Sequence, residues 1–118
     1  MSNSLPSSDR TEHALVHESL DRAEVLHVFG EVDIFTAPDL ESAIAASVRI
    51  GRLLVVNLLE CRYIDSTVIA LLMRAQKALG NRLRVVSAET GTVRRVLTLT
   101  EVDRVLRVTS TLADALRG

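Results

Sequence analysis

Aromatic residues are scarce in this sequence, and cysteine occurs once. Only 3% of the 118 residues are Phe, Trp or Tyr, whereas 47% are hydrophobic. The core must therefore be built from Val, Leu, Ile and Ala, which is typical of layered α/β proteins rather than of aromatic-rich barrels. A single thiol, Cys61, excludes an internal disulfide and a zinc site made of cysteine pairs. It also fits a reducing cytosol, so we expect a cytoplasmic protein.

The sequence also has no large excess of positive or negative charge and no long apolar run. The chain has 14 Lys and Arg against 15 Asp and Glu, a net charge of −1. A nucleic-acid-binding domain would show a basic stripe, so no nucleic acid partner is expected. No run reaches about 18 apolar residues, so we expect no membrane insertion. Residues 1–12 are polar and contain no apolar stretch, which predicts a disordered tail rather than a signal peptide, followed by one domain over residues 13–118.

The apolar pattern predicts strands and helices in alternation. The expected strands cover residues 14–18, 23–29, 53–58, 83–87 and 105–108. The expected helices begin at Thr36, at Ser66, at Thr92 and after Thr111. The first two strands form a hairpin, and the remaining alternation of strand and helix predicts a mostly parallel sheet of about four to five strands, flanked by about four helices. The fold class is therefore α/β.

Asp65, Ser66 and Thr67 form the most informative motif. They follow the apolar strand 53–58 and start a helix, and open α/β sheets present binding groups at the carboxyl ends of their strands. A phosphate on Ser66 would carry about −1.5 to −2 charges. A helix N-terminus tolerates that charge, but a partner surface would have to desolvate it. From the residues alone, the triplet is also explained as an ordinary helix cap, and both interpretations stay open.

A second segment ends the predicted hairpin. Asp33 follows the strand 23–29, and it would share a sheet edge with Ser66 if that strand neighbours the strand 53–58. Asp33 is then either part of a partner-binding rim or a solvated acidic turn.

Residues for catalysis or cofactor binding are missing. His13, His17 and His27 lie in the N-terminal segment and lack the third ligand of a zinc site. No glycine-rich nucleotide loop is present, and no Gly-x-Ser-x-Gly motif surrounds Ser66. Arg94 and Arg95 are expected on the solvated face of their helix. We therefore predict a protein that is not an enzyme, with no catalytic residues, no metal and no cofactor.

Two segments together resemble the STAS domain family. The first, from Gly30 to Leu40, reads GEVDIFTAPDL and is similar to the family's Gly-Glu-Leu-Asp segment with its later Thr and Leu. The second, from Val55 to Thr67, reads VVNLLECRYIDST and is similar to an aliphatic strand followed by Phe-Ile-Asp-Ser-Ser/Thr-Gly. The order and spacing of the segments also fit, and the resemblance runs from about residue 14 to residue 116. It implies the STAS-type α/β fold.

The resemblance also implies a function. STAS proteins of this kind are anti-sigma factor antagonists. They bind an anti-sigma factor that has serine kinase activity, are switched off when it phosphorylates them, and are reset by a serine phosphatase. By motif, Ser66 is the phosphorylation site. The implied partner-binding residues are Asp33, Asp65, Ser66, Thr67 and Val68.

One position departs from the family pattern, because Val68 stands where the family has glycine. A β-branched side chain there is expected to reshape the kinase contact, or to mark a branch with another partner. The alternative function is therefore a STAS accessory subunit of a lipid-transport ATPase or a stress-signalling complex, without phosphorylation.

Overall fold

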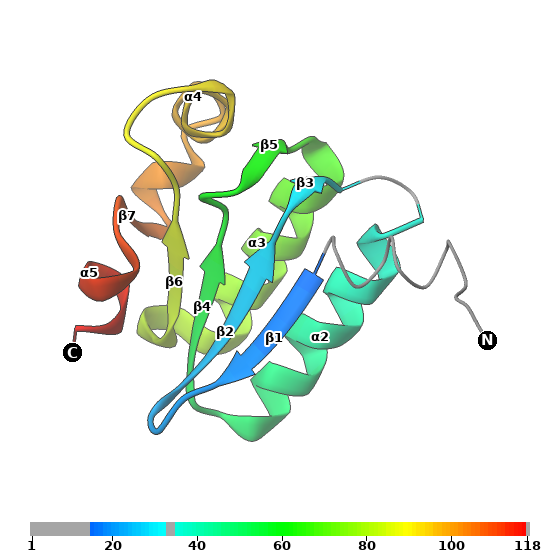
Figure 1. The fold of residues 1–118 in the computed structure, drawn as a ribbon, viewed down its shortest axis with the longest axis vertical. Helices are drawn as coiled ribbons and strands as arrows, with labels where there is room; N and C mark the ends of the chain where they lie inside the picture. The colour runs from blue at the N-terminus through cyan, green and yellow to red at the C-terminus, as the bar shows by residue number, and fades with distance from the viewer. Residues whose placement is uncertain (1–14, 33–34, 118) are drawn as a thin grey trace.

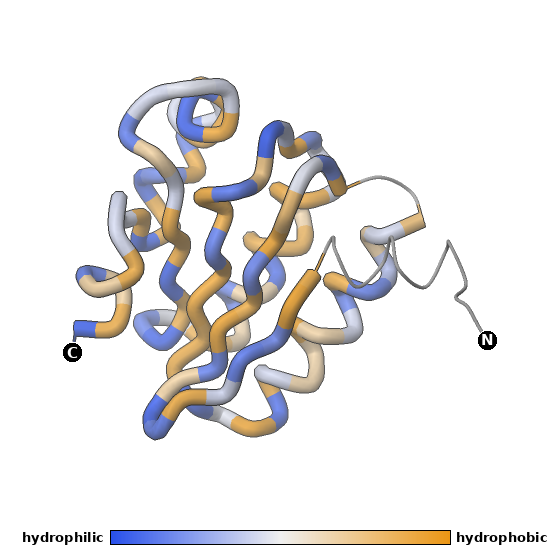
Figure 2. The backbone as a smooth tube through the Cα atoms, viewed as in Figure 1, coloured by the Kyte–Doolittle hydropathy of each residue, from blue (hydrophilic) through white to orange (hydrophobic). Residues whose placement is uncertain are grey.

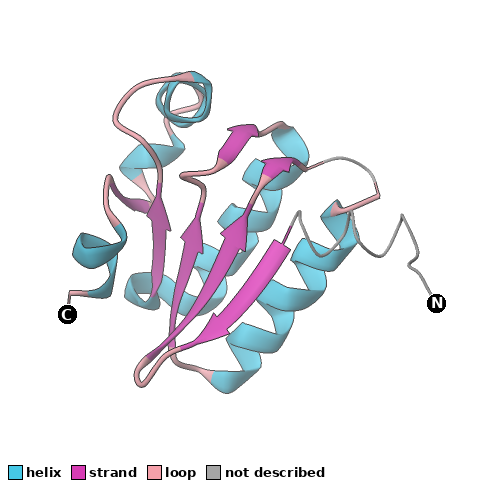
Figure 3. Ribbon diagram, in the orientation of Figure 1, coloured by secondary structure: helices cyan, strands magenta, loops and turns pink. Residues whose placement is uncertain are grey.

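The protein folds as a twisted sheet between helices (Figures 1 and 3). The structure, a computed structural model, describes residues 15–32 and 35–117. Its main sheet has the order β1-β2-β4-β6-β7. The strands are β1 (Leu15–Ser19), β2 (Ala23–Val28), β4 (Leu53–Asn57), β6 (Leu83–Val86) and β7 (Arg107–Thr109). β1 runs antiparallel to β2 and all other neighbours are parallel, which confirms the predicted hairpin and the mostly parallel α/β sheet.

Helices cover both faces of the sheet. They are α2 (Ala37–Ile50), α3 (Ser66–Leu79), α4 (Thr92–Leu99) and α5 (Leu112–Leu116). The first three lie between parallel strands and contribute to one core, whereas α5 packs on the opposite face. None of the helices in the described ranges is long and apolar enough to cross a membrane.

The alternation of side chains along the strands builds these two cores. Leu26 and Leu54 face α2 and α3, and Val25 and Val55 face the α5 side; all four are 0% exposed. Successive residues of a strand point to opposite faces, so a continuous apolar run is what a strand covered on both sides needs. Figure 2 shows the hydrophobic stretches that recur along the central strands. The aliphatic run 53–58 was correctly predicted as such a strand.

A buried carboxylate locks the hairpin end of the sheet. Glu24 is 1% exposed, yet it lies in phase with the core residue Leu26. Its oxygens accept hydrogen bonds from Ser19 (2.6 Å) and Arg52 (2.6 Å), and they lie 2.6 Å from Nε2 of His17. The Ser19 hydrogen bond is the main cause that lowers the pKa of Glu24, and His17 and Arg52 lower it further against the opposing effect of burial. Glu24 is thus a fully paired buried anion that joins β1, β2 and the start of β4.

The ends of α2 differ from each other. Thr36 occupies the predicted N-cap position but makes no capping hydrogen bond through its side chain. At the other end Gly51 adopts φ 79°, and its N–H donates to the carbonyl of Ser47 at 3.1 Å. A left-handed residue at this position is the usual helix stop, and it favours glycine.

Two details of the strands depart from the sequence prediction. The segment after β4 contains a short strand, β5 (Cys61–Tyr63), which pairs with β3 (Gly30–Glu31) instead of forming a plain loop. The last strand covers Arg107–Thr109 rather than 105–108. The reason is a 3₁₀ turn over Val102–Arg104, whose hydrogen bonds extend to the N–H groups of Val105 and Leu106.

Candidate functional site

The candidate site lies where the parallel strands end, on the β3–β5 pair. Gly30 takes φ 69°, and its N–H donates to the carbonyl of Glu60 at 3.0 Å, which turns the chain from β2 into β3. In Figure 1, β3 and β5 lie side by side above the carboxyl ends of β2 and β4, next to the start of α3. This small sheet carries the chain from β4 to Ser66. The strands are too short for periodicity to have revealed them.

The loop into α3 is held by a buried side chain and by a helix cap. Ile64 is 0% exposed and anchors the loop in the core. Asp65 is the N-cap of α3, and its Oδ1 accepts hydrogen bonds from the N–H groups of Thr67 (3.0 Å) and Val68 (3.3 Å). The predicted capping role of Asp65 is therefore confirmed. Such a cap is worth about 1 kcal/mol and sets the direction of the first helical turn.

The residues that follow Asp65 divide between surface and core. Ser66 and Thr67 are exposed, so the structure brings the two predicted hydroxyl groups to the surface at the start of α3. Val68 is 0% exposed and belongs to the main core. A side chain without exposed surface cannot meet a partner, so the interpretation of Val68 as a partner-binding residue is corrected. Asp33, the other predicted member of the rim, lies outside the described residues.

Exposed apolar side chains lie on the segments that lead into α2 and α3. Tyr63 on β5 is 46% exposed, and Leu59 in the turn before β5 is 39% exposed. Phe35, which precedes α2, is 74% exposed. Arg62 is exposed between Cys61 and Tyr63 on β5. Apolar side chains rimmed by polar groups are typical of protein-binding surfaces.

A hydrogen-bonded chain supports the turn beneath this surface. Asn57 accepts a hydrogen bond from the N–H of Leu59 through Oδ1 (3.0 Å), so its Nδ2 donates to Nδ1 of His27 (3.0 Å). His27 then carries its proton on Nε2, which lies 2.8 Å from Oε1 of Glu18. Both ring nitrogens of His27 therefore contact other side chains of the protein, and neither is left to bind a metal. No group of three metal-binding side chains occurs among residues 15–32 and 35–117.

Arg94 was wrongly predicted to be a solvated residue. It is partly buried, and it donates to the Oγ (2.9 Å) and the carbonyl (2.9 Å) of Ser87 and to the carbonyl of Thr109 (3.5 Å). These bonds attach α4 to the carboxyl ends of β6 and β7, and α4 in turn packs against β5. Arg95 is exposed, as predicted. Arg94 therefore supports the β3–β5 pair through α4.

Cys61, the first residue of β5, is buried in the main core. Its Sγ donates to the carbonyl of Tyr63 at 3.3 Å. Burial is the main cause that raises the pKa of this thiol. A thiol with a raised pKa is a poor nucleophile, so Cys61 contributes packing rather than chemistry.

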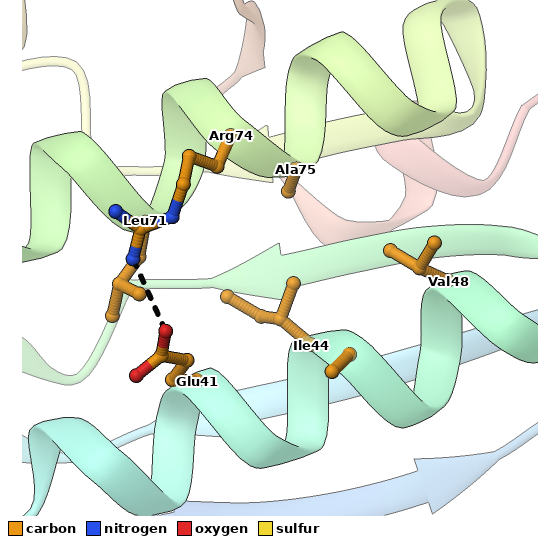
Figure 4. A pocket seen from close by; sticks show the side chains of 7 residues that line it. Glu41, Ile44, Val48, Leu71, Arg74 and Ala75 are labelled. Carbon is orange, nitrogen blue, oxygen red and sulfur yellow. Dashed lines mark hydrogen bonds and ion pairs between the residues drawn. The ribbon is translucent and has the colours of Figure 1, made fainter.

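A hollow between α2 and α3 offers no reactive group (Figure 4). It has a volume of about 230 Å³ and an apolar floor that includes Ile44, Leu71 and Ala75. Its two charged residues, Glu41 and Arg74, pair with each other at 3.3 Å. The hollow thus presents apolar surface and a self-neutralised ion pair, and Ser66 is not part of its lining.

The sequence matches the family model of the STAS domain over residues 14–115. It finds no match among curated protein sequences. Among solved structures, an anti-sigma factor antagonist from Mycobacterium paratuberculosis has 34% sequence identity and a TM-score of 0.77. The matched region covers 86% of this chain and 89% of that one.

More distant structures share the fold. A putative anti-sigma factor antagonist from Thermotoga maritima has 19% identity and a TM-score of 0.74, with 91% of this chain and 95% of that chain covered. The Bacillus cell fate determinant SpoIIAA in its phosphorylated form has 18% identity and a TM-score of 0.66, with 87% and 96% covered. At these identities the likeness concerns the fold alone.

Proposed function

The chain belongs to the STAS domain family, and from that premise we propose that it is an anti-sigma factor antagonist that is switched off by phosphorylation of Ser66. The observation that carries the proposal is the exposed Ser66 directly after the capping Asp65, at the start of α3. The relative at 34% identity is an anti-sigma factor antagonist, which supports the same role here. The protein acts by binding and not by catalysis.

The Asp65 cap decides where a phosphate on Ser66 would point. The N–H groups of Thr67 and Val68, which would otherwise bind an anion at the helix start, already donate to Asp65. A phosphoryl group of about −1.5 to −2 charges would also be repelled by that carboxylate. It therefore extends outward into the partner interface, where it must be desolvated. Phosphorylation then blocks binding and leaves the fold intact.

The partner of this surface is an anti-sigma factor with serine kinase activity. Tyr63 and Leu59 are exposed in the segment that leads to Ser66 and can supply apolar contact area. Aromatic anchors dominate many protein interfaces. The kinase brings ATP and magnesium, so this chain holds neither. A serine phosphatase resets the switch, and both reactions take place in the cytoplasm.

Binding and phosphorylation test the proposal together. The chain is incubated with a candidate anti-sigma factor kinase from the same genome and with ATP, and the phosphate is mapped by mass spectrometry. Modification is expected at Ser66. In a binding assay with the same kinase, Ser66→Asp is expected to weaken the complex at least about tenfold, or about 1.4 kcal/mol, whereas Ser66→Ala binds constitutively.

Ser42 provides the matched control for added charge. It is an exposed serine on α2, so Ser42→Asp is expected to leave the affinity unchanged within about twofold. Efficient phosphorylation only at other residues, or equal losses for Ser42→Asp and Ser66→Asp, would refute the proposal.

The alternative role as a STAS accessory subunit rested on Val68. Because this side chain is buried, it does not alter the surface around Ser66. No feature of the described structure therefore favours the alternative. Recovery of a transport ATPase and no kinase in a pull-down would reverse this preference.

A further inference from the structure

A buried cation lies at the other end of the molecule. Arg84 on β6 is 6% exposed. Its Nη1 donates to the carbonyls of Ala115 (2.9 Å) and Arg117 (2.8 Å), and its Nε donates to the carbonyl of Asn81 (3.2 Å). All these acceptors are neutral, and within residues 15–32 and 35–117 no carboxylate forms an ion pair with Arg84. A buried charge without a counter-ion is costly, so this region favours an anion.

A second arginine adds to the positive charge. Arg107 on the edge strand β7 is the register partner of Arg84, so the two side chains project from the same face of the sheet. Burial is the main cause that lowers the pKa of Arg84, and the charge of Arg107 lowers it further. Arg107 itself is exposed and has no hydrogen-bond or ion-pair partner in the described part of the chain.

Arg107 borders an open cavity on the surface between β7 and α5, and Arg84 lies next to Arg107 on β6 without lining it. The cavity has a volume of about 570 Å³ and is lined by Arg107, Thr109, Ser110, Asp114 and Arg117. The site is wide open to solvent.

The charges around the cavity do not balance. Among the described lining residues, the one carboxylate belongs to Asp114; it lies 3.4 Å from Arg117, and this pair is solvent-exposed. Within residues 15–32 and 35–117, Arg84 and Arg107 have no paired carboxylate. Ser110 adds a hydroxyl group that can donate a hydrogen bond.

We infer that the cavity between β7 and α5 is a binding site for a phosphoryl group, with Arg107 as the principal ligand and Ser110 and Arg117 as supporting donors. A guanidinium group presents two parallel N–H donors that match the oxygens of a phosphate. Arg84 does not touch the phosphoryl group, but its positive charge attracts it, because Arg84 lies next to Arg107 and donates to the carbonyl of Arg117. The phosphoryl group belongs either to a small free phosphate or to a phosphorylated residue of another protein.

The site is independent of the proposed switch. The site lies between β7 and α5, whereas Ser66 begins α3, and α3 and α5 pack on opposite faces of the sheet. Failure of one proposal therefore leaves the other standing.

An NMR titration of the full chain tests the inference. ¹⁵N-labelled protein is titrated with inorganic phosphate and, separately, with capped phosphoserine, at constant ionic strength set by sodium chloride. Saturable shifts are expected for the amides of residues 107–110 and 117. Shifts with both ligands indicate that the phosphoryl group suffices, and shifts with capped phosphoserine alone indicate a phosphorylated protein as the source. Shifts with neither ligand would overturn the inference.

Two exposed arginines make a matched pair of variants. Arg107→Gln is expected to weaken phosphate binding about tenfold. Arg49→Gln removes an exposed arginine from α2, on the opposite side of the sheet, and is expected to change the affinity less than about twofold. Equal losses in both variants would mean that phosphate senses only the net charge, and the site would be refuted. The spectra of the free variants report whether each is folded.

Discussion

Replacement of Val68 by glycine tests whether this position belongs to the core or to the partner surface. Val68 is 0% exposed at the start of α3. Val68→Gly removes three buried carbon atoms at about 0.8 kcal/mol each, and glycine has a lower helix propensity than valine by a few tenths of a kcal/mol. The expected loss in the free energy of unfolding is about 3 kcal/mol. For a domain of this size, this lowers the melting temperature by about 12 °C.

The assay is urea unfolding followed by circular dichroism, with thermal unfolding as a second measurement. Ala70→Gly is the control, because Ala70 is exposed on the same helix and reports the backbone effect of glycine alone, about 1 kcal/mol. The informative quantity is the difference between the two variants, about 2 kcal/mol. If Val68→Gly costs no more than Ala70→Gly, the side chain is not packed in the core, and its exclusion from the partner surface is wrong.

Three further predictions follow from buried or constrained groups. Glu24→Gln is expected to cost about 2 kcal/mol at pH 7, because charge-assisted hydrogen bonds are lost. The folded-state pKa of Glu24 lies below the ordinary value of 4.5, mainly through Ser19, so its contribution is complete above about pH 4.5 and is lost as the pH falls through the lower value. Between pH 7 and pH 3, the free energy of unfolding should therefore decrease less for Glu24→Gln than for the unmodified protein. An equal decrease in both proteins would contradict this. Gly51→Ala should cost about 1 kcal/mol or more in urea unfolding, since φ is 79° and the new Cβ would approach Arg82 to 3.3 Å; an unchanged midpoint would be the contrary result. Arg94→Gln should increase hydrogen exchange in α4 more than in α2, and uniform protection would show that Arg94 does not hold the helix.

The sequence was sufficient for most of the architecture. The hairpin and the helix starts at Ser66, at Thr92 and after Thr111 agree with the structure. Thr111 caps the last of these helices, because its Oγ1 accepts a hydrogen bond from the N–H of Asp114. In these elements the alternation of apolar and polar residues continues over many positions, or a capping residue marks the helix start, and both signals are visible in a single sequence. The β3–β5 pair has neither, because a strand of two or three residues shows no periodicity.

Val68 shows how two sequence signals can conflict. The family motif places position 68 beside the switch serine, which suggested a surface role. The helical period places Val68 in phase with Leu72, Ala75 and Leu79, all of which are buried. The period was the better guide, because it reports the direction of a side chain, whereas a motif reports only a position along the chain.

Charged residues were the hardest to place. Arg94 lies between two buried helix positions, and only the tertiary structure brings carbonyl groups within its reach. Glu24 did carry a signal, because it alternates in phase with Leu26 and Val28. A carboxylate in a core phase is a reason to look for nearby cations, and Arg52 is the one that the fold supplies.

The central position of β4 has a consequence for how the protein opens. β4 is hydrogen-bonded on both sides, to β2 and to β6, whereas β1 and β7 form the edges of the sheet. Backbone amides of doubly paired, buried strands exchange with solvent only in the rarest openings, and edge elements open first. The segment that leads to Ser66 leaves the carboxyl end of this central strand and passes through β5. Under the proposed switch, the kinase would therefore meet the Ser66 hydroxyl in its native geometry, even while the edge strands open.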